Sequence, residues 1–143
     1  MTWEATSSVD IDASPACVWD VLLDGRRWNS WSPGVEWMVV EDEVSAGKLI
    51  TLKPKGAPQT AFTIEDLQPD ALLVMRITFG PVAALRLRWL LEPYGSGTRL
   101  SATVAIAGIA AGLLLKKGAR AIASAMPGNL ERLAAVCAGT AHA

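Results

Sequence analysis

Apolar and polar side chains alternate from about residue 35 to residue 107, the pattern of strands that bury one face. The alternation falls into six runs, at residues 35–42, 47–54, 60–67, 72–80, 84–93 and 98–107. Turn residues separate the runs, for example Pro69-Asp70 and Gly80-Pro81. Because links this short join antiparallel neighbours, the pattern predicts an antiparallel sheet.

Before this region the chain predicts one more strand and two short helices. The strand is expected over residues 3–11. Ser14 is a natural N-cap, and Pro15 at the first helical position loses no hydrogen bond, so a helix begins here and is expected to stop at Asp24-Gly25. A second helical turn follows in the tryptophan-rich stretch of residues 26–37 and ends at Pro33-Gly34.

The run at residues 84–93 indicates that one face of the sheet is covered. Leu85, Leu87, Trp89 and Leu91 fall on one face, and Arg86 and Arg88 fall on the other. The cover is predicted to be a helix at residues 112–138, where apolar residues repeat at intervals of three and four: Leu115, Ala119, Ile122, Met126, Leu130, Leu133 and Cys137. Pro127-Gly128 predicts a kink in it, or two helices in line.

Length and charge narrow the class of protein. A chain of 143 residues suits a single domain, here residues 1–143. The formal net charge of −1 gives no electrostatic support for a nucleic-acid partner. Residues 103–115 are apolar but too short for a transmembrane segment, so only surface association stays open. No secretory signal is visible at the start, so a cytoplasmic location is expected.

The residues that carry most enzyme chemistry are scarce. The single histidine, His142, lies in the C-terminal tail, and Cys17 and Cys137 are far apart in sequence, so no metal, no cofactor and no catalytic residue is predicted. Both cysteines are expected to be reduced and buried. The carboxylates Glu36, Glu41, Asp42 and Glu43 are expected on a solvated edge, and Lys53 and Lys55 in a solvated loop, with anion capture as the alternative for the lysines.

Three local patterns carry a resemblance to a known fold family. They are Val18-Trp19 with Asp24, the cluster of Trp28 and Trp31 with Pro33, and Glu92-Pro93 before Gly97-Thr98. With the order of elements, they resemble the START-like helix-grip superfamily (SRPBCC, Bet v 1-like), in particular its bacterial polyketide cyclase/dehydrase-type members. The resemblance implies an α+β helix-grip fold: a curved seven-stranded antiparallel sheet wrapped around a long C-terminal helix, with two short helices between strands 1 and 2.

The resemblance also implies a cavity between sheet and helix, and its predicted walls are apolar. The expected function is therefore binding of a small hydrophobic ligand that is lipid-like, aromatic or a polyketide. The predicted ligand-binding residues are Trp31, Trp37, Phe62, Met75, Ile77, Leu87, Trp89, Leu115, Ile122 and Met126. Trp28 and Trp31 are expected to close one end of the cavity, by packing in the core or by touching the ligand.

Two other functions stay open at this point. One is a polyketide cyclase/dehydratase-like enzyme that acts by positioning its substrate, and the other is an interaction module whose cavity is filled by its own side chains. The identity of the ligand and the choice between a monomer and a homodimer are also left open by the sequence.

Overall fold

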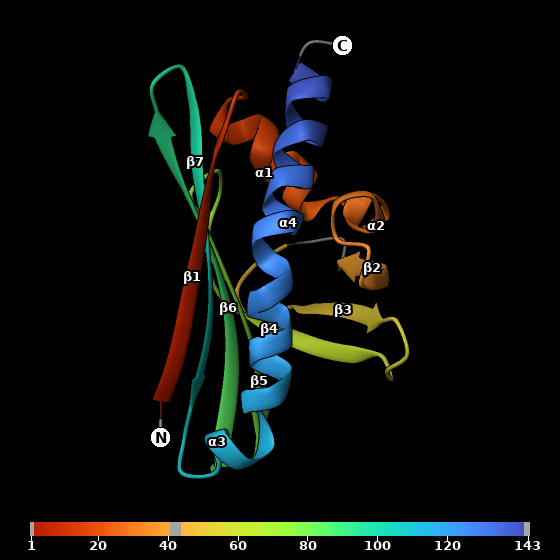
Figure 1. The fold of residues 1–143 in the computed structure, drawn as a ribbon, viewed down its shortest axis with the longest axis vertical. Coiled ribbons are helices and arrows are strands. Elements are labelled where there is room, and N and C mark those ends of the chain that lie inside the picture. The colour runs from red at the N-terminus through yellow and green to blue at the C-terminus, as the bar shows by residue number, and fades with distance from the viewer. Residues whose placement is uncertain (1, 41–43, 142–143) are drawn as a thin grey trace.

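The computed structural model describes residues 2–40 and 44–141 as one antiparallel sheet packed against helices (Figure 1). The strands are β1 (Thr2–Ile11), β2 (Val35–Val40), β3 (Leu49–Pro54), β4 (Thr60–Gln68), β5 (Leu72–Phe79), β6 (Ala83–Tyr94) and β7 (Gly97–Ala107). The helices are α1 (Pro15–Leu23), the short 3-10 turn η1 (Gly25–Arg27), α2 (Trp28–Trp31), α3 (Ala111–Leu114) and α4 (Lys116–Ala141).

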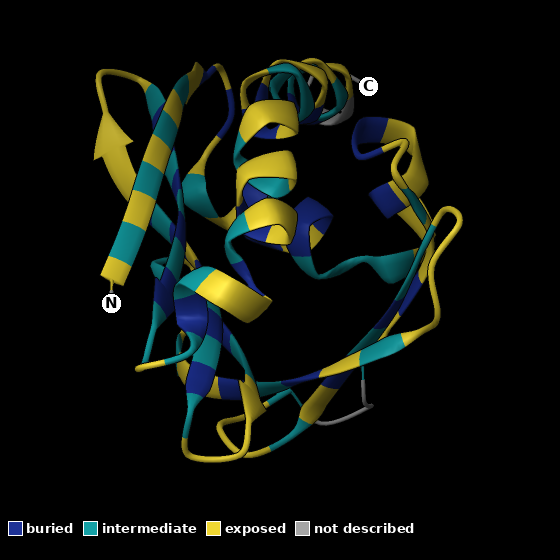
Figure 2. Cartoon of the chain, turned by 60° about the horizontal axis from the view of Figure 1, so that its bottom comes forward, coloured by how far each residue is buried: buried dark blue, intermediate teal, exposed yellow. Residues whose placement is uncertain are grey.

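The sheet has the order β1-β7-β6-β5-β4-β3-β2, and every neighbouring pair is antiparallel. It curls around α4, which runs along its concave face, while α1 and α2 close one end of the curl (Figures 1 and 2). The predicted α+β helix-grip fold is therefore confirmed, with its seven-stranded sheet, long C-terminal helix and two short helices between strands 1 and 2.

Alternation along each central strand decides which side chains enter the core. Leu85, Leu87, Trp89 and Leu91 of β6 are buried, as predicted. On the opposite face Glu65 lies between Arg86 and Arg76, with N–O distances of 2.7 and 3.4 Å. The hydrogen bond from Arg86 holds the pKa of Glu65 below its ordinary value. This arrangement keeps the charged residues on the convex face, away from the space between sheet and helix.

Helix α1 begins and ends for different physical reasons. Ser14 caps the helix by accepting a hydrogen bond from the Cys17 amide at 3.2 Å, as its sequence position predicts. At the other end Gly25 does not have the positive φ of a glycine helix stop. A Cβ atom at this position would collide with the carbonyl oxygen of Met38. Glycine is required here because η1 passes directly against β2.

The C-terminal helix differs from its prediction in two respects. It begins at Lys116 rather than near Gly112, because residues 111–114 form the separate helix α3. It also continues through Pro127 to Ala141, so the alternative of two helices in line is wrong. Pro127 is exposed, whereas Met126 and Leu130 on either side of it are buried. Burial of both flanking turns outweighs the one hydrogen bond that proline removes.

The two cysteines, 120 residues apart in sequence, meet where α1 packs on α4. The Cys17 thiol lies 4.0 Å from the backbone oxygen of Cys137. Both cysteines are free thiols; Cys137 is buried as predicted, but Cys17 is only partly buried. Burial raises the pKa of the Cys137 thiol to about 12, from an ordinary value of 9.0.

This raised pKa predicts a loss of stability at alkaline pH. Between pH 9 and about pH 12 the unfolded chain loses the Cys137 proton and the folded chain keeps it. The free energy of unfolding should then fall by at most about 1.4 kcal/mol per pH unit from this group. Urea unfolding of the wild type and of Cys137→Ala at pH 8, 9 and 10 measures the difference, because the other titrating groups are common to both. Equal pH slopes would contradict the prediction.

Candidate functional site

The side chains of α4 do not fill the concave face of the sheet, and two adjoining cavities remain. We call the first the tryptophan cavity; it has a volume of about 300 Å³, and its walls include Trp28, Trp31, Ser32, Leu87, Trp89, Ala121, Ala125, Met126 and Asn129. The second, the Phe79 cavity, has a volume of about 460 Å³, and its walls include Gln59, Thr60, Ile77, Phe79, Leu85 and Leu115. Leu52, Pro54, Phe62 and Ile122 line both.

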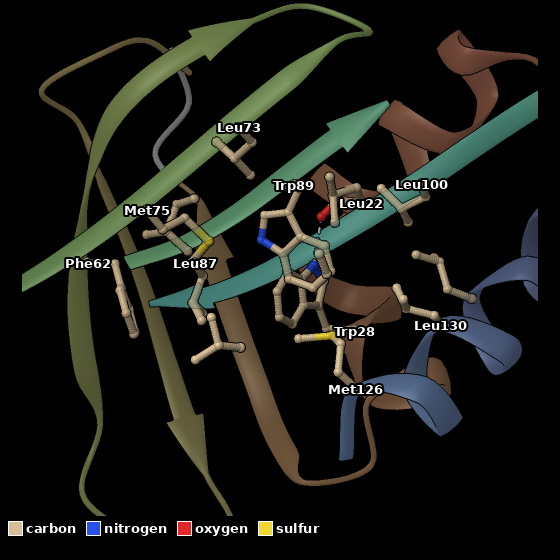
Figure 3. Close-up of a cluster of buried hydrophobic side chains, with 14 of the residues drawn as sticks. Leu22, Trp28, Phe62, Leu73, Met75, Leu87, Trp89, Leu100, Met126 and Leu130 are labelled. Atoms are coloured by element: carbon tan, nitrogen blue, oxygen red, sulfur yellow. Dashed lines mark hydrogen bonds between the residues drawn. The ribbon is translucent and has the colours of Figure 1, made fainter. Parts of the chain in front are cut away.

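Three tryptophans form one end of the tryptophan cavity. The ring centroids of Trp28 and Trp31 lie 4.6 Å apart, and each lies 5.9 Å from the ring of Trp89 in an edge-to-face arrangement. The Trp28 indole donates a hydrogen bond to the carbonyl oxygen of Leu22 at 2.7 Å (Figure 3). The cluster ties the α1–α2 region to β6 and also supplies cavity wall, so packing and lining are both roles of the same rings.

Two of these indoles lack the hydrogen bond that Trp28 makes. Within the described residues, the Nε1 atoms of Trp31 and Trp89 are buried and have no hydrogen-bond partner. A buried donor without an acceptor costs about 1–3 kcal/mol. Both rings also line the tryptophan cavity.

A polar corner interrupts the apolar wall. Asn129 of α4 donates to the Ser32 hydroxyl at 3.4 Å and accepts from the Arg132 guanidinium at 2.6 Å. Arg132 also donates to the backbone oxygen of Trp31 at 3.1 Å. These bonds join α4 to the end of α2 and hold the hydroxyl and the amide at the cavity surface. The corner can therefore offer hydrogen bonds to one polar group of a ligand.

Sequence analysis missed Ser32 and Asn129, although part of the signal was present. Asn129 follows Met126 by three residues and precedes Leu133 by four, which places it on the sheet-facing stripe of the helix. Ser32 gave no such signal, because it stands at the irregular end of α2, where periodicity does not apply.

Of the ten predicted ligand-binding residues, eight line one or both cavities: Trp31, Phe62, Ile77, Leu87, Trp89, Leu115, Ile122 and Met126. Trp37 and Met75 are not among the lining residues. The β2–β3 register shifts between Val35 and Trp37, so Met38 is buried and Trp37 is 38% exposed. Met75 is paired with Leu87 and shares its face of the sheet, but it is completely covered by its neighbours. Contact with a ligand stays a prediction for the other eight.

Ionisable groups stand outside these walls. None of the described residues that line the two cavities is Asp, Glu, His or Lys. Lys53 pairs with Glu36 at 3.2 Å, and Lys55 is exposed. Glu41, Asp42, Glu43 and His142 lie outside the described residues. Over the described ranges, no group of three or more His, Cys, Asp and Glu side chains is placed to hold a metal ion, and no helix is long and apolar enough to cross a membrane.

A family model described as "Polyketide cyclase / dehydrase and lipid transport" matches residues 2–138. No curated protein sequence matches the chain. Three similar solved structures illustrate the likeness of fold at low sequence identity. Ara h 8.0201 is 10% identical, with a TM-score of 0.69 over 96% of this chain and 98% of its own.

The other two structures are of aromatase/cyclases. Zhui from Streptomyces sp. R1128 is 18% identical, with a TM-score of 0.68 over 96% of this chain and 94% of its own. The di-domain ARO/CYC StfQ from the steffimycin biosynthetic pathway is also 18% identical, with a TM-score of 0.74 over all of this chain. This chain spans about half of StfQ, 53% of its length. At such identities the likeness shows the fold.

Proposed function

The chain belongs to the polyketide cyclase/dehydrase and lipid transport family, and from that premise we propose that it binds a small hydrophobic ligand between the sheet and α4. The observation that carries the proposal is the pair of adjoining cavities, of about 300 and 460 Å³, with walls that are mostly apolar. Ligand sites in proteins have volumes of about 300–1,000 Å³ and walls of this kind.

The polar groups of the wall define the ligand further. Ser32 and Asn129 line the tryptophan cavity and offer hydrogen bonds at one corner of its otherwise apolar wall. A pure hydrocarbon would make no hydrogen bond to either residue. We therefore propose a ligand with an apolar body and at least one acceptor oxygen, such as an oxygenated aromatic or polyketide.

Narrowing the cavity should weaken binding without unfolding the protein. Ala125 lines the tryptophan cavity from an exposed position on α4, so Ala125→Phe adds a ring at the rim and leaves the buried stripe unchanged. We expect an anilinonaphthalene dye to bind at least tenfold more weakly to this variant, measured by titration of dye fluorescence. Ala135→Phe is the matched control, because Ala135 is exposed on the same helix and lines neither cavity.

The same dye titration can also contradict the proposal. Unchanged dye affinity in Ala125→Phe would mean that the tryptophan cavity is not the binding site. Absence of dye binding to the wild type would favour the interaction module with a filled core. In the expected case the dye also changes the emission of Trp31 and Trp89, since both rings lie in the wall.

A polyketide cyclase/dehydratase-like enzyme that works by positioning its substrate is the second candidate. The family favours it, and so does the likeness of fold to the aromatase/cyclases Zhui and StfQ. The described walls contain hydroxyl and amide groups but no carboxylate or imidazole, so catalysis would rest on orientation and exclusion of water. Incubation with a linear poly-β-ketone separates the two functions: a carrier returns it unchanged, whereas a cyclase releases a ring product faster than buffer does.

The proposal retains three expectations about the setting of the protein. They are a cytoplasmic location, the absence of a nucleic-acid partner and a homodimer as the alternative to a monomer. The near-neutral formal charge of −1 supports the second. Light scattering of the purified protein distinguishes monomer from dimer.

A further inference from the structure

Large aliphatic side chains are exposed at the end of the molecule where α3 lies, outside the two cavities. Ile109 and Leu113 are 87% and 89% exposed, and Leu114 is 54% exposed. Single exposed apolar residues are common, but three within six consecutive positions are not explained by packing in this chain. We call Ile109, Leu113 and Leu114, together with Phe79, the apolar tip.

Backbone hydrogen bonds place Phe79 next to the other residues of the tip. It is 44% exposed at the end of β5, and its carbonyl accepts a hydrogen bond from the Val82 amide across the β5–β6 turn. The carbonyl of Val82 in turn accepts a hydrogen bond of 2.9 Å from the Ala110 amide, next to Ile109. The β5–β6 turn and α3 are therefore fixed side by side, and both lie at the lower end in Figure 1. Figure 2, with this end turned forward, shows the exposed face of α3.

Basic residues adjoin the tip without acidic neighbours in sequence. Lys116, Lys117 and Arg120 occupy the first turns of α4, and Lys117 and Arg120 are exposed. The sequence contains no Asp or Glu between Glu92 and Glu131. On β1, which packs against α3, Glu4 points to the convex face of the sheet. A chain with a formal charge of −1 thus places three positive charges beside its most exposed aliphatic residues.

We propose that this end of the protein docks on an anionic membrane surface, with Ile109 and Leu113 inserted between lipid headgroups and the basic residues facing lipid phosphates. Aliphatic residues flanked by lysine and arginine are the combination that binds such surfaces. A second copy of the chain fits the tip less well. A two-fold contact through it would bring Lys116 and Lys117 of both copies together, and like charges would repel.

Docking in this orientation does not require the proposed ligand, but it would place one of the two cavities near the membrane. Phe79 and Leu115 line the Phe79 cavity and also stand at the tip or beside it. If the proposed function holds, that cavity would lie close to the bilayer, where hydrophobic ligands concentrate.

Co-sedimentation with vesicles tests the proposal. The full chain is mixed with vesicles of phosphatidylcholine alone, or of phosphatidylcholine with about 30% phosphatidylglycerol. The second lipid gives the vesicle surface a negative charge. We expect binding to the anionic vesicles, weakened at least tenfold by Ile109→Gln with Leu113→Gln. Both side chains are exposed, so this variant should keep the thermal midpoint of the wild type. Lys116→Gln with Lys117→Gln should reduce both the affinity and its dependence on salt.

Val39→Gln is the matched control, because Val39 is 58% exposed on β2, away from the tip, and its replacement should leave vesicle binding unchanged. Equal binding of the tip variant and the wild type would overturn the proposal, as would a wild type that binds no vesicles. Concentration-dependent dimerisation that the tip variant abolishes, without vesicle binding, would assign the tip to a second copy instead. Dye binding is measured on the same variants. It tests the proposed ligand cavity, so failure of membrane docking can be told apart from failure of the proposed function.

Discussion

Replacing Leu130 with Asp is expected to unfold the protein. Leu130 lies on the sheet-facing stripe of α4 and is only 1% exposed, so the new carboxylate would be buried among apolar side chains (Figure 3). An unpaired charge in such a position costs several kcal/mol, which is comparable to the roughly 5–15 kcal/mol that stabilises a whole domain. The expected result is the loss of a cooperative thermal transition in circular dichroism.

Two further variants on α4 make the test specific. Ser124→Asp places the same charge on an exposed position of the helix and should keep a cooperative transition close to that of the wild type. Ile122→Asp should be less severe than Leu130→Asp, because Ile122 is only partly buried and lines both cavities. The sequence periodicity alone predicts equal damage at positions 122 and 130. A wild-type midpoint for Leu130→Asp would contradict the observed packing of α4.

Trp31→Ala should have the second-largest effect. The Trp31 ring is completely buried, and it contacts the rings of Trp28 and Trp89. Removing a buried aromatic side chain typically costs about 3–5 kcal/mol, since it leaves a cavity as well as losing apolar burial. Urea unfolding measures the change. The same variant should alter dye binding, because the ring forms cavity wall.

Trp37→Ala is the control for this prediction within the same tryptophan-rich stretch. Trp37 is 38% exposed on the edge strand β2, so its removal should cost roughly 1 kcal/mol or less. Similar losses of stability in Trp31→Ala and Trp37→Ala would contradict the structure, in which Trp37 is partly exposed and Trp31 is fully buried. The difference between them is invisible in the sequence, where Trp28, Trp31 and Trp37 look alike.

Much of the fold could be predicted because its signals are local. Alternation along residues 84–93 assigns Leu87 and Trp89 to the core whatever the partner strands are, since side chains on a strand point to opposite faces in turn. The cap at Ser14 works through a neighbouring amide within the same turn. The intervals of three and four likewise predict the buried stripe of α4 from Ala119 to Cys137, in which only Ile122 is partly rather than fully buried.

The sequence by itself therefore determined the order of the seven strands and the main helices, and the face that the central strands and the C-terminal helix bury, but it did not separate α3 from α4. Only the tertiary structure decided which inward residues border open space. Met75 and Leu87 have the same parity, yet one is covered and the other lines a cavity, because that depends on which side chains lie opposite across the core. The register shift that turns Trp37 outward arises from pairing between β2 and β3. The polar corner of Ser32 and Asn129 joins residues 97 positions apart, a contact that exists only once α4 packs beside α2.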